Sequence, residues 1–178
     1  FSLVMNSPGD HRLNPGMGGG ALWDAGCYPI SFFRAALDAE PLEVCGFQQP
    51  GPSGVDMSFA GQLRFPPDVL AQFFCSLGTV THHEFSIAGT TGRIRLDHPW
   101  LHDVGKSATV FVERPGAADG ATTVFEQVEP YRCQVEGMAA AVLDEARPTV
   151  SVASSRGNVA ALEALFESAR DGRAVAVT

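Results

Sequence analysis

Basic residues are scarce in this sequence. Its 178 residues include 12 lysines and arginines against 20 aspartates and glutamates, which gives a formal net charge of -8 at pH 7. The basic residues are scattered, whereas nucleic acids and anionic membranes are bound by clustered Lys and Arg. We therefore expect no nucleic acid and no membrane among the partners of this protein.

Long apolar runs are also lacking. No stretch approaches the ~20 apolar residues that a membrane-spanning helix needs, and no segment has the pattern of a secretory signal. Apolar residues make up 45% of the chain and charged residues 18%, a balance typical of globular proteins. The length suits one hydrophobic core, so we expect a soluble single domain over residues 1–178.

The sequence contains no C-x-x-C pair. Its four cysteines are widely spaced, each in an apolar context: Cys27, Cys45, Cys75 and Cys133. This pattern is typical of buried free thiols in a reducing cytoplasm, and we expect a cytoplasmic location on that ground. A disulfide is the less favoured alternative, because the pairing depends on the fold.

Apolar periodicity predicts one helix, a series of strands, two further helices and a last strand. Residues 18–37 are helical in pattern, and Pro29 should kink or divide that helix because it lacks an amide hydrogen. The strands are predicted at 41–49, 55–65, 69–77, 82–90, 92–97, 109–114 and 122–128. The closing elements are helices at 129–145 and 154–172 and a strand at 173–177.

This order predicts an α+β fold with an open, mostly antiparallel mixed sheet and helices packed on one face. The strand at 69–77 is apolar on both faces. If helices cover one face, then Leu70 and Phe74 on the other need a different cover, and the sheet of a second subunit is the simplest candidate. We expect a homodimer through the open sheet face.

The segment "GMGGGALWDAGCY" at 16–28 contains G-x-G-x-x-A, the skeleton of a dinucleotide-binding loop. Such a loop follows a buried strand, and an acid ends a second strand about 20 residues further on. Here the preceding "GDHRLNP" is no buried strand, and Asp38 lies between a helix and a strand. We reject phosphate binding. The glycines instead allow a sharp turn and a close approach of the helix start to a ligand or another domain.

Asp24 and Tyr28 are four residues apart and share one helix face. A carboxylate beside a phenol can handle a proton, with the phenol as acid or base and the carboxylate as its orienting partner. On these residues alone the structural interpretation is favoured: Asp24 caps the helix start and Tyr28 packs with its hydroxyl satisfied. Trp23 is interpreted as a packing residue rather than a platform for a sugar ring.

Two pairs of histidines are poor candidates for a metal site. His98 and His102 lie four apart, but Pro99 argues against the helix that would bring both rings to one side. His82 and His83 are neighbours on a predicted strand and point to opposite faces. We expect no metal.

Several segments together resemble one family. The stretch "GMGGGALWDAGCYPI" is similar to the start of the second domain in the glucose-fructose oxidoreductase / inositol dehydrogenase / MocA-like family. The segments "LRF…AQFFCSL" and "IAGTTGRIRLDHPW" resemble its strand pair and Gly-Thr turn, and the last two helices resemble its C-terminal pair. "HRLNPGMGGGALWDAGCY" resembles the sugar- or dihydrodiol-dehydrogenase-like branch, which has Tyr where inositol dehydrogenase-like members have His.

The resemblance implies a substrate-binding and dimerisation domain of an oxidoreductase that uses NAD or NADP and acts on CH–OH groups of a sugar, polyol or related compound. Tyr28 matches the catalytic acid/base position, and Asp24 matches the acid that binds or polarises the substrate. Arg12 matches, less specifically, a substrate-side arginine near the cleft. Family members pair through the free sheet face, and an N-terminal Rossmann domain binds the cofactor and supplies a lysine from an E-K-P motif.

The chain has neither a Rossmann fingerprint nor an E-K-P motif. It reads as a C-terminal piece of a longer chain, and we expect it to be inactive alone and to bind no cofactor tightly. The alternative is a stand-alone, non-catalytic dimerising or ligand-binding module derived from the same fold. The presence of both Asp24 and Tyr28 favours the oxidoreductase.

Overall fold

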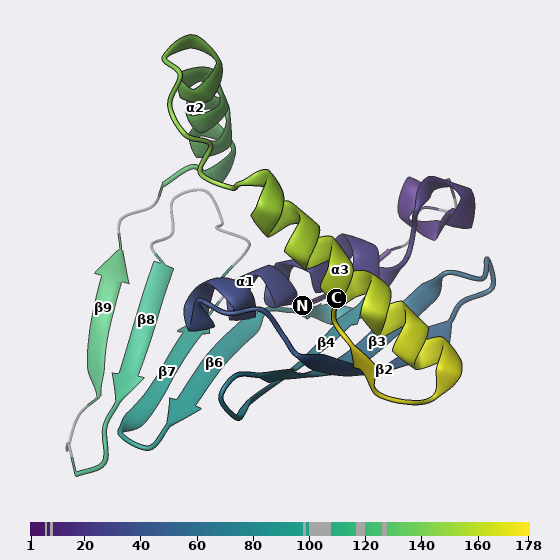
Figure 1. The fold of residues 1–178 in the computed structure, drawn as a ribbon, viewed down its shortest axis with the longest axis horizontal. Coiled ribbons are helices and arrows are strands. Elements are labelled where there is room, and N and C mark those ends of the chain that lie inside the picture. Colours follow the sequence, from purple (N-terminus) through teal and green to yellow (C-terminus); the bar gives the residue numbers. More distant parts are fainter. Residues whose placement is uncertain (6, 8, 98, 100–107, 117–119, 126–127) are drawn as a thin grey trace. The chain divides into compact units, whose positions relative to one another are not determined.

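The computed structural model describes residues 1–178 except 6, 8, 98, 100–107, 117–119 and 126–127. The described residues fall into two compact units, one of residues 1–81 and 152–178 and the other of residues 82–151 (Figure 1). No helix in the described parts of the chain is both long and apolar enough to cross a bilayer.

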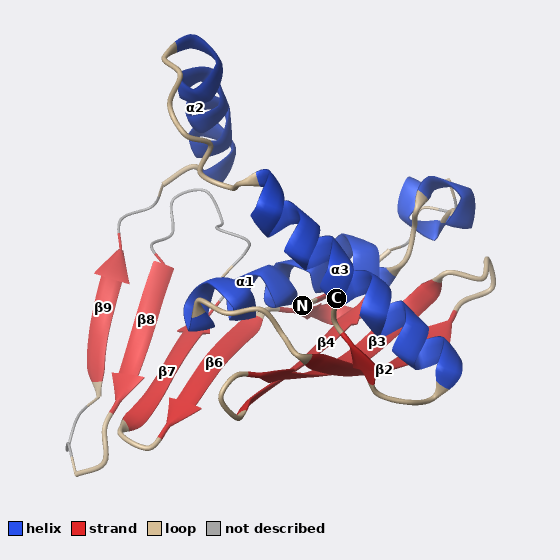
Figure 2. Cartoon of the chain, viewed as in Figure 1, coloured by secondary structure: helices blue, strands red, loops and turns tan. Residues whose placement is uncertain are grey.

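The first unit is built on a six-stranded sheet with the strand order β10-β2-β3-β4-β1-β5. Figure 2 labels its strands β2, β3 and β4. Its strands are β1 (Ser2–Val4), β2 (Glu43–Pro50), β3 (Asp56–Phe65), β4 (Val69–Ser76), β5 (Gly78–His82) and β10 (Val175–Ala176). β2 pairs antiparallel with both β10 and β3, and β3 pairs antiparallel with β4, whereas β1 pairs parallel with β4. The sheet is therefore mixed and mostly antiparallel, as the sequence predicts.

Helical segments pack on one face of this sheet (Figure 1). They are the π-helix η3 (Leu22–Gly26), α1 (Cys27–Leu37) and α3 (Val152–Asp171), and two short 3-10 turns precede them, η1 (His11–Leu13) and η2 (Pro15–Met17). Leu22, Ile30 and Leu165 from the helices meet Phe59 and Phe65 of β3 in a fully buried core. The predicted α+β class, with helices on one sheet face, is confirmed.

The first predicted helix begins later than residue 18 and changes type along its length. Gly18 and Gly20 have φ values of 70° and 120°, so the helix starts only after them. Pro29 offers no amide hydrogen to the turn before it, and the wider π-helical turn occupies that place. The Sγ of Cys27 donates to the carbonyl oxygen of Asp24 over 3.5 Å. Pro29 thus divides the helix, as expected, through a change of helix type.

The second unit contains a four-stranded antiparallel sheet in the order β6-β7-β8-β9 and one described helix. The elements are β6 (Glu84–Gly89), β7 (Gly92–Asp97), β8 (Ala108–Glu113), β9 (Ala121–Phe125) and α2 (Pro130–Leu143). The Glu129 carboxylate caps α2 by accepting from the backbone N–H of Tyr131 and Arg132. Four large apolar side chains of α2, spaced three or four residues apart, are 66–71% exposed and form its apolar stripe: Tyr131, Val135, Met138 and Val142.

The strands form two sheets, whereas the sequence predicted one. β1, from the start of the chain, occupies the position beside β4 that the next strand of a meander would take. Ser2 lies opposite Ser76, and the Ser2 hydroxyl donates to the carbonyl of Val80 on β5. β5 was not among the predicted strands, and the sequence left residues 1–5, which contain β1, open between a strand and the end of a loop. Both strands are short and show no clear apolar alternation.

The four cysteines are free, as predicted, but they are not all buried. Cys75 is fully buried, Cys27 and Cys45 are intermediate, and Cys133 on α2 is exposed. The apolar sequence context therefore predicted burial correctly for Cys75 in the sheet. It was wrong for Cys133, because the apolar side chains of α2 are themselves exposed.

Candidate functional site

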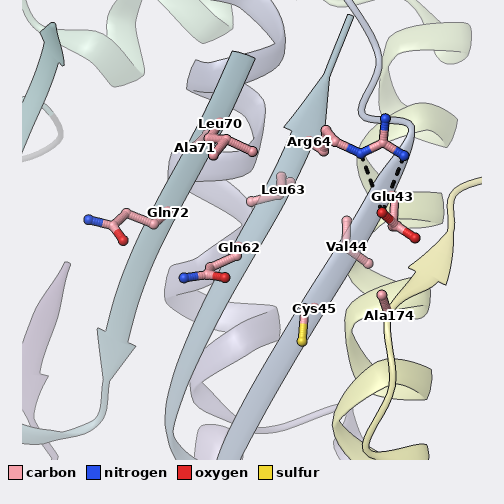
Figure 3. Close-up of a pocket in the computed structure, with 10 residues that line it drawn as sticks. All are labelled: Glu43, Val44, Cys45, Gln62, Leu63, Arg64, Leu70, Ala71, Gln72 and Ala174. Carbon is pink, nitrogen blue, oxygen red and sulfur yellow. Dashed lines mark hydrogen bonds and ion pairs between the residues drawn. The ribbon is translucent and has the colours of Figure 1, made fainter. Parts of the chain in front are cut away.

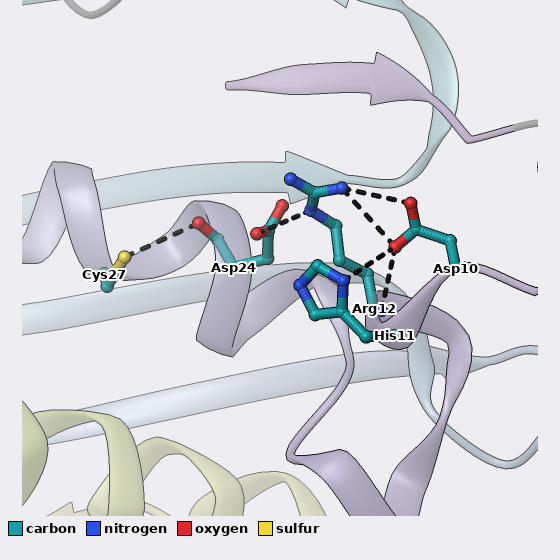
Figure 4. A network of polar contacts seen from close by, with 5 residues as sticks. All are labelled: Asp10, His11, Arg12, Asp24 and Cys27. Atoms are coloured by element: carbon teal, nitrogen blue, oxygen red, sulfur yellow. Dashed lines mark hydrogen bonds and ion pairs between the residues drawn. The ribbon is translucent and has the colours of Figure 1, made fainter.

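Arg12 joins two carboxylates beside the start of the helix (Figure 4). Its Nε donates to Asp24 Oδ1 over 2.9 Å, and its Nη1 lies 3.2 Å from Asp10 Oδ2. The hydrogen bond to Asp24 raises the pKa of Arg12, and the Arg12 backbone N–H lowers the pKa of Asp10. The guanidinium is therefore a permanent cation that fixes the orientation of the Asp24 carboxylate.

The glycine run folds back onto the segment that carries Arg12. The backbone N–H groups of Gly19 and Gly20 donate to the carbonyls of Asn14 and Arg12 over 3.1 and 2.9 Å. A Cβ on Gly19 would lie 2.4 Å from the Arg12 carbonyl oxygen. The sharp turn predicted at these glycines is therefore confirmed. Because their N–H groups bond within the chain, they do not form the phosphate cradle of a nucleotide loop.

Asp24 does not cap the helix, contrary to the structural interpretation favoured by the sequence alone. It lies inside the π-helical turn with its side chain 27% exposed, and Arg12 is 34% exposed. The first turn is capped by Asp56 of β3, whose Oδ2 accepts from the Leu22 N–H over 2.7 Å. Asp24 is thus available at the surface. It lies in a π-helical turn, a helix type that is rare in proteins as a whole but often found at functional sites.

Tyr28 is the second residue of α1, and its side chain is 46% exposed. Its ring lies 5.6 Å from that of Phe1, measured between centroids, in a tilted arrangement. The packing alternative required Tyr28 to be buried in the core, and its exposure shows that it is not. Asp24 and Tyr28 follow each other along one helical segment, one turn apart, and both reach the surface.

Trp23 is a packing residue, as predicted. Its ring lies 6.0 Å from that of Phe166 on α3, and its side chain packs against the core of the first unit.

The histidines give no metal cluster among the described residues. His82 is exposed at the end of β5, and His83 is 3% exposed and lies between β5 and β6, so the predicted single strand through both residues is wrong. His98 and His102 lie outside the described residues. Within the part of the chain that the structure describes, no three His, Cys, Asp or Glu side chains are grouped to hold a metal ion.

A shallow groove of about 440 Å³ crosses β2, β3 and β4 (Figure 3). Across it, Arg64 forms an ion pair with Glu43 over 3.2 Å, and Leu70 lies opposite Arg64 on the neighbouring strand. Leu70 is 79% exposed and Phe74 is 49% exposed. Both therefore lie on the open sheet face, as their alternation in β4 predicted.

Sequence reasoning missed two acids, Asp10 and Asp56. Asp10 accepts from the backbone N–H of Arg12 and so caps η1, a role that the pattern Asp-His-Arg before a turn could have suggested. Asp56 alternates with the polar side of β3 in sequence, yet it is 4% exposed. Only the fold reveals that the helix start lies over this end of β3.

Comparison with known proteins identifies the family. The model of the GFO/IDH/MocA C-terminal domain matches residues 2–95. The chain belongs to this family. It is 29% identical over 168 residues to D-xylose 1-dehydrogenase (NADP(+)) 2 from Haloferax volcanii, which covers 93% of this chain and 50% of that protein. The chain thus spans about half the length of the curated relatives that it matches.

Two solved structures share the fold. One is the aldose-aldose oxidoreductase from Caulobacter crescentus complexed with glycerol, with a TM-score of 0.86 and 22% identity over 98% of this chain and 53% of that one. The other is a 3-ketoreductase from Actinomadura kijaniata, a mutant in complex with TDP-benzene and NADP, with a TM-score of 0.87 and 21% identity over 94% of this chain and 51% of that one. At these identities the likeness establishes the fold and nothing finer.

Proposed function

We propose that residues 1–178 form the C-terminal, substrate-binding and dimerisation domain of an NAD- or NADP-dependent oxidoreductase that acts on a CH–OH group of a sugar, polyol or related compound. The observation that carries the proposal is the Asp24 carboxylate, held by Arg12 and followed one turn later by the half-exposed phenol of Tyr28. The D-xylose dehydrogenase among the relatives supports both the substrate class and the use of a nicotinamide nucleotide.

In this proposal each side chain has a separate role. Arg12 binds Oδ1 of Asp24, and Oδ2 accepts a hydrogen bond from a substrate hydroxyl. As the phenolate, Tyr28 takes the proton of the reacting hydroxyl during oxidation and then releases it to solvent; as the phenol, it donates a proton to the carbonyl oxygen during reduction. The nicotinamide, when bound, exchanges the hydride. The nucleotide is held mainly by a Rossmann domain outside these residues, since the glycine run here donates its N–H groups within the chain.

The decisive experiment is Tyr28→Phe in the enzyme that joins this domain to its nucleotide-binding part. Wild-type activity is first found with a panel of aldoses and polyols and both nucleotides, followed by the absorbance of the reduced nicotinamide. Because only the phenol hydroxyl is lost, we expect kcat to fall about 100-fold or more with little change in substrate affinity.

Tyr131→Phe is the matched control, since Tyr131 is exposed on α2 and should retain wild-type kcat. Equal activity of Tyr28→Phe and wild type would remove Tyr28 from the mechanism. A titration of the 178-residue chain with NADPH and NADH, followed by energy transfer from tryptophan, tests the cofactor assignment. Saturation at micromolar nucleotide would place the nucleotide site within these residues and contradict the proposal.

A further inference from the structure

Asp56, the first residue of β3, is a buried carboxylate that the proposed reaction does not use. It is 4% exposed, and burying a carboxylate is costly unless hydrogen bonds replace its water. Its replacement partners are backbone amides: the Leu22 N–H donates to Oδ2 over 2.7 Å, and the N–H groups of Asp56 itself and of Ala21 contribute as well. Two of these amides belong to the helix start and one to β3, so the carboxylate links the helix start to the sheet.

The helix start needs such an acceptor. The first N–H groups of a helix have no partner within it, and a negative charge is favoured at that end. No side chain at the N-cap position, Ala21, supplies the acceptor. Asp56 does so from 34 residues away in sequence, and it thereby ties the turn that contains Asp24 to the rigid end of β3.

Gly20 makes this contact possible. Its φ is 120°, and a Cβ built on it would lie 2.0 Å from Asp56 Oδ1. The backbone at Gly20 therefore passes directly over the carboxylate, and only a residue without a side chain fits there. The absence of a side chain at Gly20 is therefore what allows the Asp56 carboxylate to reach the helix start.

We propose that Asp56 is a positioning residue of this protein: by capping the glycine-led helix start, it fixes the turn that presents Asp24 and, four residues on, Tyr28. The catalytic half of this inference rests on the proposed function, whereas the structural half does not. Asp56 acts through the backbone of Ala21 and Leu22 and touches no substrate.

The protonation state suits this role. Burial raises the pKa of Asp56 to about 6, so at pH 7 it is mostly an ionised acceptor with two oxygens for N–H donors. Cys75 of β4 interacts electrostatically with it, but burial raises the pKa of that thiol far above its usual range. Cys75 is therefore neutral at physiological pH and adds no charge to the site.

Amide hydrogen exchange of residues 21–28 tests the structural half directly. Asp56→Ala removes both acceptors and should accelerate exchange of these amides at least tenfold. Asp56→Asn keeps one carbonyl oxygen and should give an intermediate rate, and it remains measurable if Asp56→Ala does not fold. Unchanged exchange in Asp56→Asn and Asp56→Ala would overturn the inference.

Ser168→Ala is the control for general destabilisation. Ser168 is fully buried, accepts from the Gly46 N–H over 3.0 Å and donates to the Arg173 carbonyl, away from the helix start. It should leave exchange at residues 21–28 within about threefold of wild type, and equal acceleration in both variants would also overturn the inference.

Kinetics of the intact enzyme test the catalytic half. Asp56→Ala should lower kcat at least tenfold, whereas Ser168→Ala should stay within about twofold of wild type. Equal kcat in the two variants would overturn the catalytic half. An inactive wild type would reject the proposed function instead, and the exchange comparison would still decide the role of Asp56.

Discussion

Arg12 and Asp56 hold the same helical turn by different electrostatic means. The Arg12–Asp24 pair is partly exposed, at 34% and 27% of the two side chains, so solvent screens it and it adds little to stability. Its value lies in direction, because the guanidinium fixes one oxygen of Asp24. Asp56 is buried, and its charge is costly wherever it is ionised. The turn is thus oriented at the surface and anchored in the interior.

This difference predicts a pH dependence of stability for Asp56. Its pKa is raised from 3.8 to about 6, mainly by burial, so the folded state binds the proton more tightly than the unfolded state. The stabilisation that comes from protonating Asp56 in the folded state is complete below about pH 4 and is lost as the pH rises through about 6, while the hydrogen bonds to the helix start remain. About two pKa units correspond to about 3 kcal/mol.

Urea unfolding of wild type and Asp56→Asn between pH 4 and 7.5 measures this effect, because the other titrating groups cancel in the difference. The unfolding free energy of wild type should fall relative to Asp56→Asn by about 2 kcal/mol across this range. A difference that stays constant with pH would contradict the raised pKa.

At the scale of elements, the glycine run is the tight turn that connects the Arg12 segment to the helix. Gly18 and Gly20 both have positive φ, but nothing lies within 4 Å of a Cβ built on Gly18, whereas one on Gly20 meets Asp56. Gly18→Ala should therefore cost about 1 kcal/mol for its backbone conformation alone. Gly20→Ala should cost about 3 kcal/mol, since overpacking adds to a larger backbone strain at a φ of 120°.

Thermal or urea unfolding of the two variants separates these costs. Gly9→Ala is the control, because its Cβ meets nothing within 4 Å and its φ is unstrained, and it should remain within about 0.5 kcal/mol of wild type. Equal stability losses in Gly18→Ala and Gly20→Ala would show that the carboxylate moves aside.

Most elements were predictable because each carries its own pattern. β7 was predicted at its observed bounds, and β3 and β4 to within one residue. For β1 the sequence left a strand and a loop end open, since its three residues become a strand only by pairing with β4, where Ser2 lies opposite Ser76. The division into two sheets follows from that long-range pairing, so it also lay beyond the reach of local periodicity.

The candidate site was predictable only in part, for the same reason. The spacing of Asp24 and Tyr28 placed both on one helix face, and a resemblance to a family suggested Arg12. The bond from Arg12 to Asp24 and the cap from Asp56 join segments that are 12 and 34 residues apart in sequence. The alternation of residues along β3 places Asp56 on the polar face. Alternation gives no information about the helix start that covers this end of the strand, so it could not predict that Asp56 is buried.

At the scale of the whole molecule, the open face of the first unit's sheet exposes large apolar side chains that nothing in a single chain covers among the described residues. Phe47, Ala60 and Phe74 form one row across β2, β3 and β4, and Phe47 and Leu70 are 71% and 79% exposed. Contiguous exposed apolar side chains mark interaction surfaces. The homodimer that we propose through this face would bury the row against its two-fold copy.

Leu70→Arg tests the dimer, because a two-fold interface repeats each residue and the substitution would bury two guanidinium groups. It also sets a cation beside Arg64, its neighbour across the strands. We expect wild type to sediment as a dimer at micromolar concentration and Leu70→Arg to dissociate at least 100-fold more readily. Val152→Arg, at an equally exposed position at the start of α3, should remain a dimer. A monomeric wild type, or dimers of equal stability in both variants, would mean that something other than a second copy covers this face.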